Sequence, residues 1–185
     1  RALYASWGNA PMAISLYDHS IANYLQTLNA VSSFLEKARK HLEENKYEMG
    51  EIVETRLYPD MLPFRFQIVS VAHHSLGAIE GVKAGVFGPP TDRAPHDYSA
   101  LQKLVADARD RLSKITREEI DALEGKEVVF QMGPMKAPFT AENFILSFSL
   151  PNFYFHATTA YDILRMKGAP LGKRDFMGAM RMKVA

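Results

Sequence analysis

Apolar residues recur at steps of four and three along several stretches of this chain, the spacing that places them on one face of an α-helix. The first stretch runs from about residue 15 to 45, and its stripe begins with Tyr17, Ile21 and Tyr24. No glycine or proline interrupts it. We therefore predict one long helix over these residues.

The stretch after Pro63 carries two apolar stripes. One begins with Phe64 and Ile68, and the other begins with Phe66 and Val69. Proline is well tolerated in the first turn of a helix, so we expect the second helix to begin at Pro63. A helix that is apolar on two faces is expected to lie at the centre of the molecule.

Two more helices are predicted, from about residue 99 to 115 and from about residue 140 to 167. Pro151 lies inside the last one, so a kink or a break is expected there. Gly168 followed by Pro170 is a helix stop signal. A capping box at Thr116 and Glu119 predicts a separate short helical turn before the last helix.

The connections are long. Residues 47–63 and 84–98 contain several glycines and prolines, so we expect a linker and a loop without regular structure. Residues 127–140, with Gly133 and Pro134 near the middle, suggest a short hairpin or an extended arm. We predict an all-α four-helix bundle with long connections, formed by a single domain over residues 12–185. Residues 1–11 are interpreted as a loose extension or a cloning remnant.

Composition narrows the function classes. The 185 residues are 47% apolar and 23% charged, which is an ordinary globular balance. The net charge of +1 gives no basic excess for nucleic-acid binding. The absence of cysteine excludes disulfides, thiolate zinc sites and cysteine nucleophiles, and it fits a cytoplasmic protein. No apolar run approaches the ~20 residues that a membrane span needs.

Several segments resemble one known family. They are PNFYFH at 151–156, TTAY at 158–161, ILR at 163–165, GKRDF at 172–176, LYD at 16–18, and LYPDM at 57–61 with Gln67 and His74. Together they are similar to an uncharacterised-domain family of the DinB/YfiT-like superfamily, over nearly the whole chain from Met12 on. The resemblance implies a helical bundle that is often a homodimer.

The same resemblance implies a divalent metal, zinc or nickel, in many members. Three histidines hold it, one on helix two and two on helix four that are four residues apart. Here His156 is followed four residues later by Ala160, so the triad is incomplete, and Met166 stands where relatives often carry histidine. The metal-ligand candidates are His74, His156 and His19, and Asp18 is an alternative third ligand.

His74 and His156 are also the first candidates for acid/base chemistry. Each is three and four residues from apolar stripe positions, so both are expected to point into the bundle between helices two and four. Histidine suits proton transfer because its ordinary pKa lies near neutrality. The alternative is that both are hydrogen-bonded interior histidines. Adjacent His73 is expected on another face, in packing or a dimer contact, because successive helical residues diverge by about 100°.

Asp18 and Tyr161 are further catalytic candidates, as a carboxylate and a phenol near the same cavity. For Asp18 the alternative is stabilisation by the helix dipole, and for Tyr161 it is a buried hydroxyl that is satisfied locally. The substrate-binding candidates are Tyr17, Tyr58, Phe153 and Arg174. Arg174 could instead lock the tail to the bundle, and aromatic residues at helical spacing are more often core.

These patterns favour a protein that binds a small apolar metabolite, and that could be an enzyme using His74 and His156 for isomerisation, elimination or cyclisation. The alternatives are a non-catalytic ligand-binding or scaffold protein, and a metal-dependent DinB-like transferase. The expected partners are a small-molecule ligand and a second copy of the chain, with no nucleic acid and no membrane.

Overall fold

The computed structural model describes residues 15–92 and 94–183. The extension predicted over residues 1–11 lies outside them. Along the chain the elements are α1 (Leu16–His19), α2 (Ile21–Glu44), α3 (Met49–Glu54), α4 (Phe64–Ala72), η1 (His73–Gly77), α5 (Ala78–Ala84), β1 (Val86–Phe87), α6 (Tyr98–Leu112), α7 (Arg117–Asp121), β2 (Glu127–Met132), β3 (Met135–Thr140), α8 (Ala141–Asn143), η2 (Phe144–Ser149), α9 (Leu150–Met166) and α10 (Lys173–Met177).

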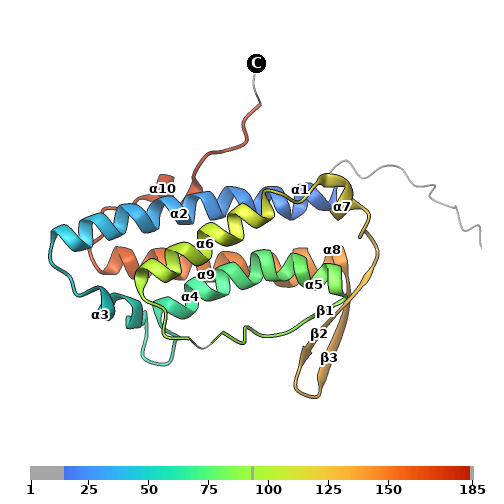
Figure 1. The fold of residues 1–185 in the computed structure, drawn as a ribbon, viewed down its shortest axis with the longest axis horizontal. Coiled ribbons are helices and arrows are strands. Elements are labelled where there is room, and N and C mark those ends of the chain that lie inside the picture. The colour runs from blue at the N-terminus through green and yellow to red at the C-terminus, as the bar shows by residue number, and fades with distance from the viewer. Residues whose placement is uncertain (1–14, 93, 184–185) are drawn as a thin grey trace, which may run out of the picture.

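The fold is mostly helical, and the four long helical stretches predicted from the sequence pack lengthwise against one another (Figure 1). Within this arrangement α2 packs on α6, and α4 packs on both α6 and α9. The stretch α4–η1–α5 therefore lies centrally, as its two apolar stripes predict. In the described part of the chain, no helix combines the length and the apolar character that a bilayer crossing needs.

The first helix is broken near its start, which the sequence analysis did not predict. Ser20 separates α1 from α2 with φ −112° and ψ −84°. Its Oγ donates a hydrogen bond of 2.6 Å to the carbonyl of Leu16. Such a bond from serine to the carbonyl four residues earlier competes with the regular helix and bends it.

Two expected loops contain short regular elements. The linker over residues 47–63 holds α3, whose Ile52 and Val53 are buried. The loop over residues 84–98 holds β1, which directly follows Gly85 at φ +75°. Both elements are too short for periodicity to reveal, so the prediction of irregular structure was wrong in these places.

A small sheet corrects the all-α prediction. The expected hairpin is present as β2 and β3, which pair antiparallel, and β1 pairs parallel with β2. In Figure 1 the hairpin projects from the end of the bundle near α5 and α8. The hairpin packs against helix four through Phe130 of β2 and Phe139 of β3. The ring centroid of Phe148 lies 4.8 Å from that of Phe130 and 6.1 Å from that of Phe139.

Helices two and four each contain a π-helical segment, η1 and η2. The chain runs through Pro151 as a helix, so the break allowed for there does not occur. Proline has no N–H and cannot continue the regular hydrogen-bond ladder. The wider turns of η2 end at Ser149, just before Pro151. A helix can accommodate the missing hydrogen bond of a proline through such a π-helical turn.

Gly81 marks a close approach between α5 and β1. A Cβ at this position would lie 2.9 Å from Cδ2 of Phe87 and 3.1 Å from the carbonyl oxygen of Val86. We expect Gly81→Ala to lower the free energy of unfolding by about 1–3 kcal/mol, because the ring of Phe87 and the carbonyl of Val86 must both move to make room. Gly50→Ala in α3 is the matched control, since a Cβ at Gly50 would meet no atom within 4 Å. Chemical denaturation of both variants measures this, and equal stability of the two would contradict the expectation.

Candidate functional site

His74 and His156 lie together between helices two and four. Their ring centroids are 5.7 Å apart and their planes are inclined by 14°. His74 is buried, with 6% of its surface exposed, whereas His156 is partly exposed. The structure thus brings together the two histidines that the apolar stripes indicate.

Gln67 fixes the tautomer of His156. Its Oε1 lies 2.8 Å from Nδ1 of His156, and its Nε2 donates a bond of 2.7 Å to the carbonyl of Leu62. Because the carbonyl can only accept, the amide nitrogen must face Leu62, so the amide oxygen faces the histidine. Nδ1 of His156 therefore carries the proton, and the lone pair is on Nε2. This nitrogen receives no hydrogen bond from residues 15–92 or 94–183.

Both histidines are neutral at physiological pH. Burial lowers the pKa of His74 to about 3, and His73 and His156 nearby lower it further in the same sense. Burial also lowers the pKa of His156 to about 4, with a smaller contribution from His73. In the described chain, Nδ1 of His74 is a buried polar atom without a hydrogen-bond partner.

The two π-helical segments meet at this pair. Ser149, the last residue of η2, donates a hydrogen bond of 2.7 Å to the backbone carbonyl of His74 in η1. Its single proton is then used, so the hydroxyl of Tyr24, 2.7 Å away, must donate to Ser149. A buried chain of hydroxyls thus ties helix one to the wide turns of helices two and four. Such turns occur frequently at functional sites.

His73 is a third member of the group, which the sequence analysis assigned only to packing or a dimer contact. Its Nε2 lies 2.7 Å from the carbonyl oxygen of Gly88 and therefore donates to it. Its ring centroid is 5.3 Å from that of His74 and 4.5 Å from that of Phe87. Burial lowers the pKa of His73 as well. We call His73, His74 and His156 the histidine cluster.

Phenylalanines surround this cluster. Phe87 and Phe148 contact His74 at centroid distances of 5.6 and 5.9 Å. Phe66 contacts His156 at 5.9 Å. The site is therefore an apolar and aromatic environment that contains three neutral imidazoles. Phe87 and Phe148 were missed because their places depend on the hairpin and on η2, not on a regular stripe.

Asp18 and Tyr17 do not join the cluster. Arg117 of α7 binds Asp18 through two hydrogen bonds of 2.7 and 2.8 Å, and hydrogen bonding to this guanidinium holds the pKa of the Asp18 carboxyl well below its usual range. The same guanidinium lies over the ring of Tyr17, 4.7 Å from its centroid. Next to them, Nδ1 of His19 contacts the carbonyl of Ser15 at 3.1 Å. Asp18 and Tyr17 thus belong to a contact between α1 and α7, and His19 contacts the chain just before its own helix.

The remaining candidates are also elsewhere. Phe153 is fully buried and packs edge-on against Tyr24 at 5.1 Å. Tyr161 packs against Phe34 and Phe176. Tyr58 is 66% exposed in the connection between α3 and α4.

Arg174 is exposed on α10, and it is not the residue that fastens this helix. That role falls to Asp175, which accepts a bond from the backbone N–H of Gly172 and pairs with Lys37 of α2 at 3.0 Å.

The donor set does not fit the metal site that the resemblance implies. His74 and His156 supply two imidazoles, whereas a protein zinc site needs at least three protein ligands. The position that would supply a third, Ala160, is a buried alanine. No group of three or more histidine, aspartate or glutamate side chains in residues 15–92 and 94–183 could hold an ion.

Comparison with known proteins identifies relatives by sequence and by fold. A family model described as a domain of unknown function, DUF1993, matches residues 16–177. No curated protein matches the chain. A solved structure of a DinB family member protein from Shewanella denitrificans superposes with a TM-score of 0.74, at 22% identity, over 92% of this chain and 96% of that one. At this identity the likeness concerns the fold alone.

Proposed function

Because this chain belongs to the DUF1993 family, we propose from its site that it binds a small, mostly apolar metabolite and performs acid/base chemistry on it through His156. The surroundings support such a ligand, because phenylalanines border the histidine cluster. The bundle is proposed to be a four-helix bundle of the DinB-like kind that works as a homodimer. The dimer remains a prediction.

One observation carries the proposal: Gln67 holds His156 with the proton on Nδ1. A general base must present a lone pair in a fixed direction, and a second partner on the other ring nitrogen provides that direction. Partial exposure of His156 leaves room for a substrate to approach. His74 packs against the ring and keeps its surroundings poorly hydrated.

The chemistry follows from the lone pair that Gln67 leaves on Nε2 of His156. Nε2 of His156 removes a proton from a carbon acid, and the electron pair of the broken C–H bond shifts into the substrate. The resulting imidazolium is a strong acid, because the pKa of His156 is about 4, so it returns the proton rapidly to another substrate atom. Isomerisation, elimination and cyclisation all consist of such paired proton transfers, in which one proton is removed and another is returned.

Two other functions are alternatives to acid/base catalysis. The buried, partnerless Nδ1 of His74 favours a non-catalytic ligand-binding protein in which a bound molecule supplies the missing hydrogen bond. A metal-dependent DinB-like transferase would need a third ligand from outside the described residues. Zinc or nickel bound per chain, measured in the protein and in His156→Ala, separates this last possibility from the others.

Ring opening of nitrobenzisoxazole tests the proposal. A base removes the ring C–H proton, the N–O bond breaks, and the nitrile-phenolate product absorbs visible light. We expect the initial rate to fall at least about tenfold in His156→Ala. The rate of the unmodified protein should persist down to about pH 5, since His156 stays neutral there.

Two further variants serve as controls. His41→Ala, at the end of α2, should leave the rate unchanged. Gln67→Glu should keep the tautomer but move the pH profile to higher pH, because a carboxylate stabilises the imidazolium. An identical rate in the unmodified protein and His156→Ala would overturn the acid/base proposal.

A further inference from the structure

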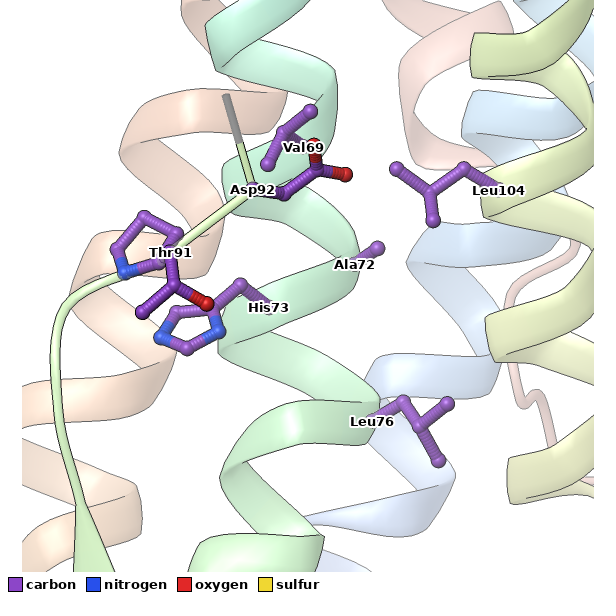
Figure 2. Close-up of a pocket in the computed structure, with 8 residues that line it drawn as sticks. Val69, Ala72, His73, Leu76, Thr91, Asp92 and Leu104 are labelled. Carbon is purple, nitrogen blue, oxygen red and sulfur yellow. The ribbon is translucent and has the colours of Figure 1, made fainter. Parts of the chain in front are cut away.

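A pocket of about 200 Å³ lies on another face of helix two, against α6 and the loop that follows β1. Figure 2 shows Val69, Ala72 and Leu76 along one side and Leu104 of α6 opposite. The three helix-two residues are spaced by three and four, so they form one apolar wall. An apolar cavity of this size suits a small organic molecule better than water.

Asp92 provides the charge at this pocket. It is the one charged side chain among the described residues that line the cavity, and Figure 2 shows its carboxylate directed toward Val69 and Leu104. Its Oδ1 accepts a bond of 2.9 Å from the N–H of Ala94, and its Oδ2 lies 2.7 Å from Nε2 of His96. The N–H of Ala94 is the main reason why the pKa of Asp92 is lowered. The group is therefore a carboxylate at neutral pH, and each oxygen retains acceptor capacity.

His73 is the other polar side chain that matters here. Its Nε2 proton is already donated to Gly88, so it offers no donor to an anionic ligand through that nitrogen. It is uncharged because burial lowers its pKa. A ligand in this pocket thus meets an apolar wall, a neutral imidazole, the Thr91 side chain and one negative charge, the exposed carboxylate of Asp92.

From this arrangement we infer that the pocket is a second ligand site, and that it takes a small amphipathic cation, an aliphatic or aromatic amine with its apolar part against Val69, Ala72 and Leu104 and its ammonium group at Asp92. Negative charge at the rim disfavours a carboxylate of the same size. The site goes beyond the function proposed for His156, which faces α4 through Gln67 and Phe66. Gln67, which holds the His156 ring, lies on a different face of the helix from Val69 and Ala72.

Calorimetric titration with three probes of one carbon frame tests the inference: phenethylamine, phenethyl alcohol and hydrocinnamate. We expect the amine to bind about fivefold more tightly than the alcohol, and the carboxylate to bind more weakly than both. Asp92→Asn should abolish the difference between amine and alcohol while the alcohol still binds. Ala72→Leu should weaken all three, because it fills the cavity, and its melting temperature shows whether the variant is folded.

Asp162→Asn is the matched control. Asp162 is a second carboxylate beside an apolar surface groove, which is lined by Leu57, Met61 and Phe155. It should leave the affinity for the amine unchanged. Equal affinity for amine and carboxylate, or an equal loss in Asp92→Asn and Asp162→Asn, would overturn the inference. His156→Ala should not alter amine binding. If it abolished binding, the two sites would be one, whereas loss of ring-opening activity alone would leave the amine site intact.

Discussion

Phe153→Ala is expected to lower the free energy of unfolding by about 3–5 kcal/mol, the range for removing a large aromatic side chain from a core. Phe153 is fully buried, and its ring packs edge-on against Tyr24 at a centroid distance of 5.1 Å. The hydroxyl of Tyr24 donates to Ser149, so the cavity would also loosen the contact between helices one and four. The sequence analysis placed Phe153 among the substrate-binding candidates, and in the structure its side chain lies in the core.

Phe155→Ala is the natural control. It changes the same residue type on the same helix, two positions away, but the Phe155 side chain is 56% exposed. We expect its loss of stability to stay below about 1 kcal/mol. Urea denaturation followed by circular dichroism measures both variants. A small effect of Phe153→Ala, or equal effects of the two, would mean that Phe153 is not a core residue.

Acidification from pH 7 to pH 5 is expected to destabilise the fold markedly, before the carboxylates titrate. The folded-state pKa of His74 is about 3, while the unfolded chain has the ordinary value near 6.5. Between these values the unfolded state binds more protons, so stability falls as the pH falls through this window. For His74 alone the loss by pH 5 is about 2 kcal/mol. His156, with a pKa of about 4, adds a smaller loss because it is partly exposed.

Denaturation midpoints at pH 7, 6 and 5 measure this dependence. His74→Leu should flatten the curve, because it removes the group that resists protonation and also removes a buried nitrogen without a partner. His41→Leu, at the end of α2, should leave the slope unchanged. A slope that is equal in the unmodified protein and His74→Leu would show that burial of His74 does not control acid stability.

Periodicity located the long helices because each buries one stripe, and the capping box at Thr116 and Glu119 was confirmed in detail. It could not locate α3 or β1, which are too short to show a period. The break at Ser20 depends on one serine rotamer, which the sequence does not specify. The hairpin was predicted from its glycine and proline. The sequence did not predict that the hairpin helps to place phenylalanines beside His74.

At the site, His74 and His156 were recognised because both border apolar stripes. His73 was assigned elsewhere on the assumption that neighbouring residues diverge by the regular helical angle. The rings of His73 and His74 nevertheless lie 5.3 Å apart, as close as the adjacent rings of Phe155 and His156 in α9, so neighbouring aromatic side chains on one helix can still meet. Tyr161 lies on the expected stripe of helix four but packs against Phe176, away from the histidines, because periodicity gives the face of a helix and not the position along it. Asp18, which was expected only as a first-turn carboxylate, pairs with Arg117.

The paired π-helical segments have a consequence for how this family varies. A π-segment is equivalent to one extra residue in an otherwise regular helix, so loss of a single codon from η1 would restore α-geometry. The wide turn already absorbs that extra residue, so the helices on either side of it would keep their facing after the deletion. Gln67 and the apolar face of α5 would stay in place, and the residues of η1 itself, His73 and His74 among them, would shift. One-residue gaps at η1 in related sequences would therefore mark members that keep the bundle and lose the wide turn that carries His73 and His74.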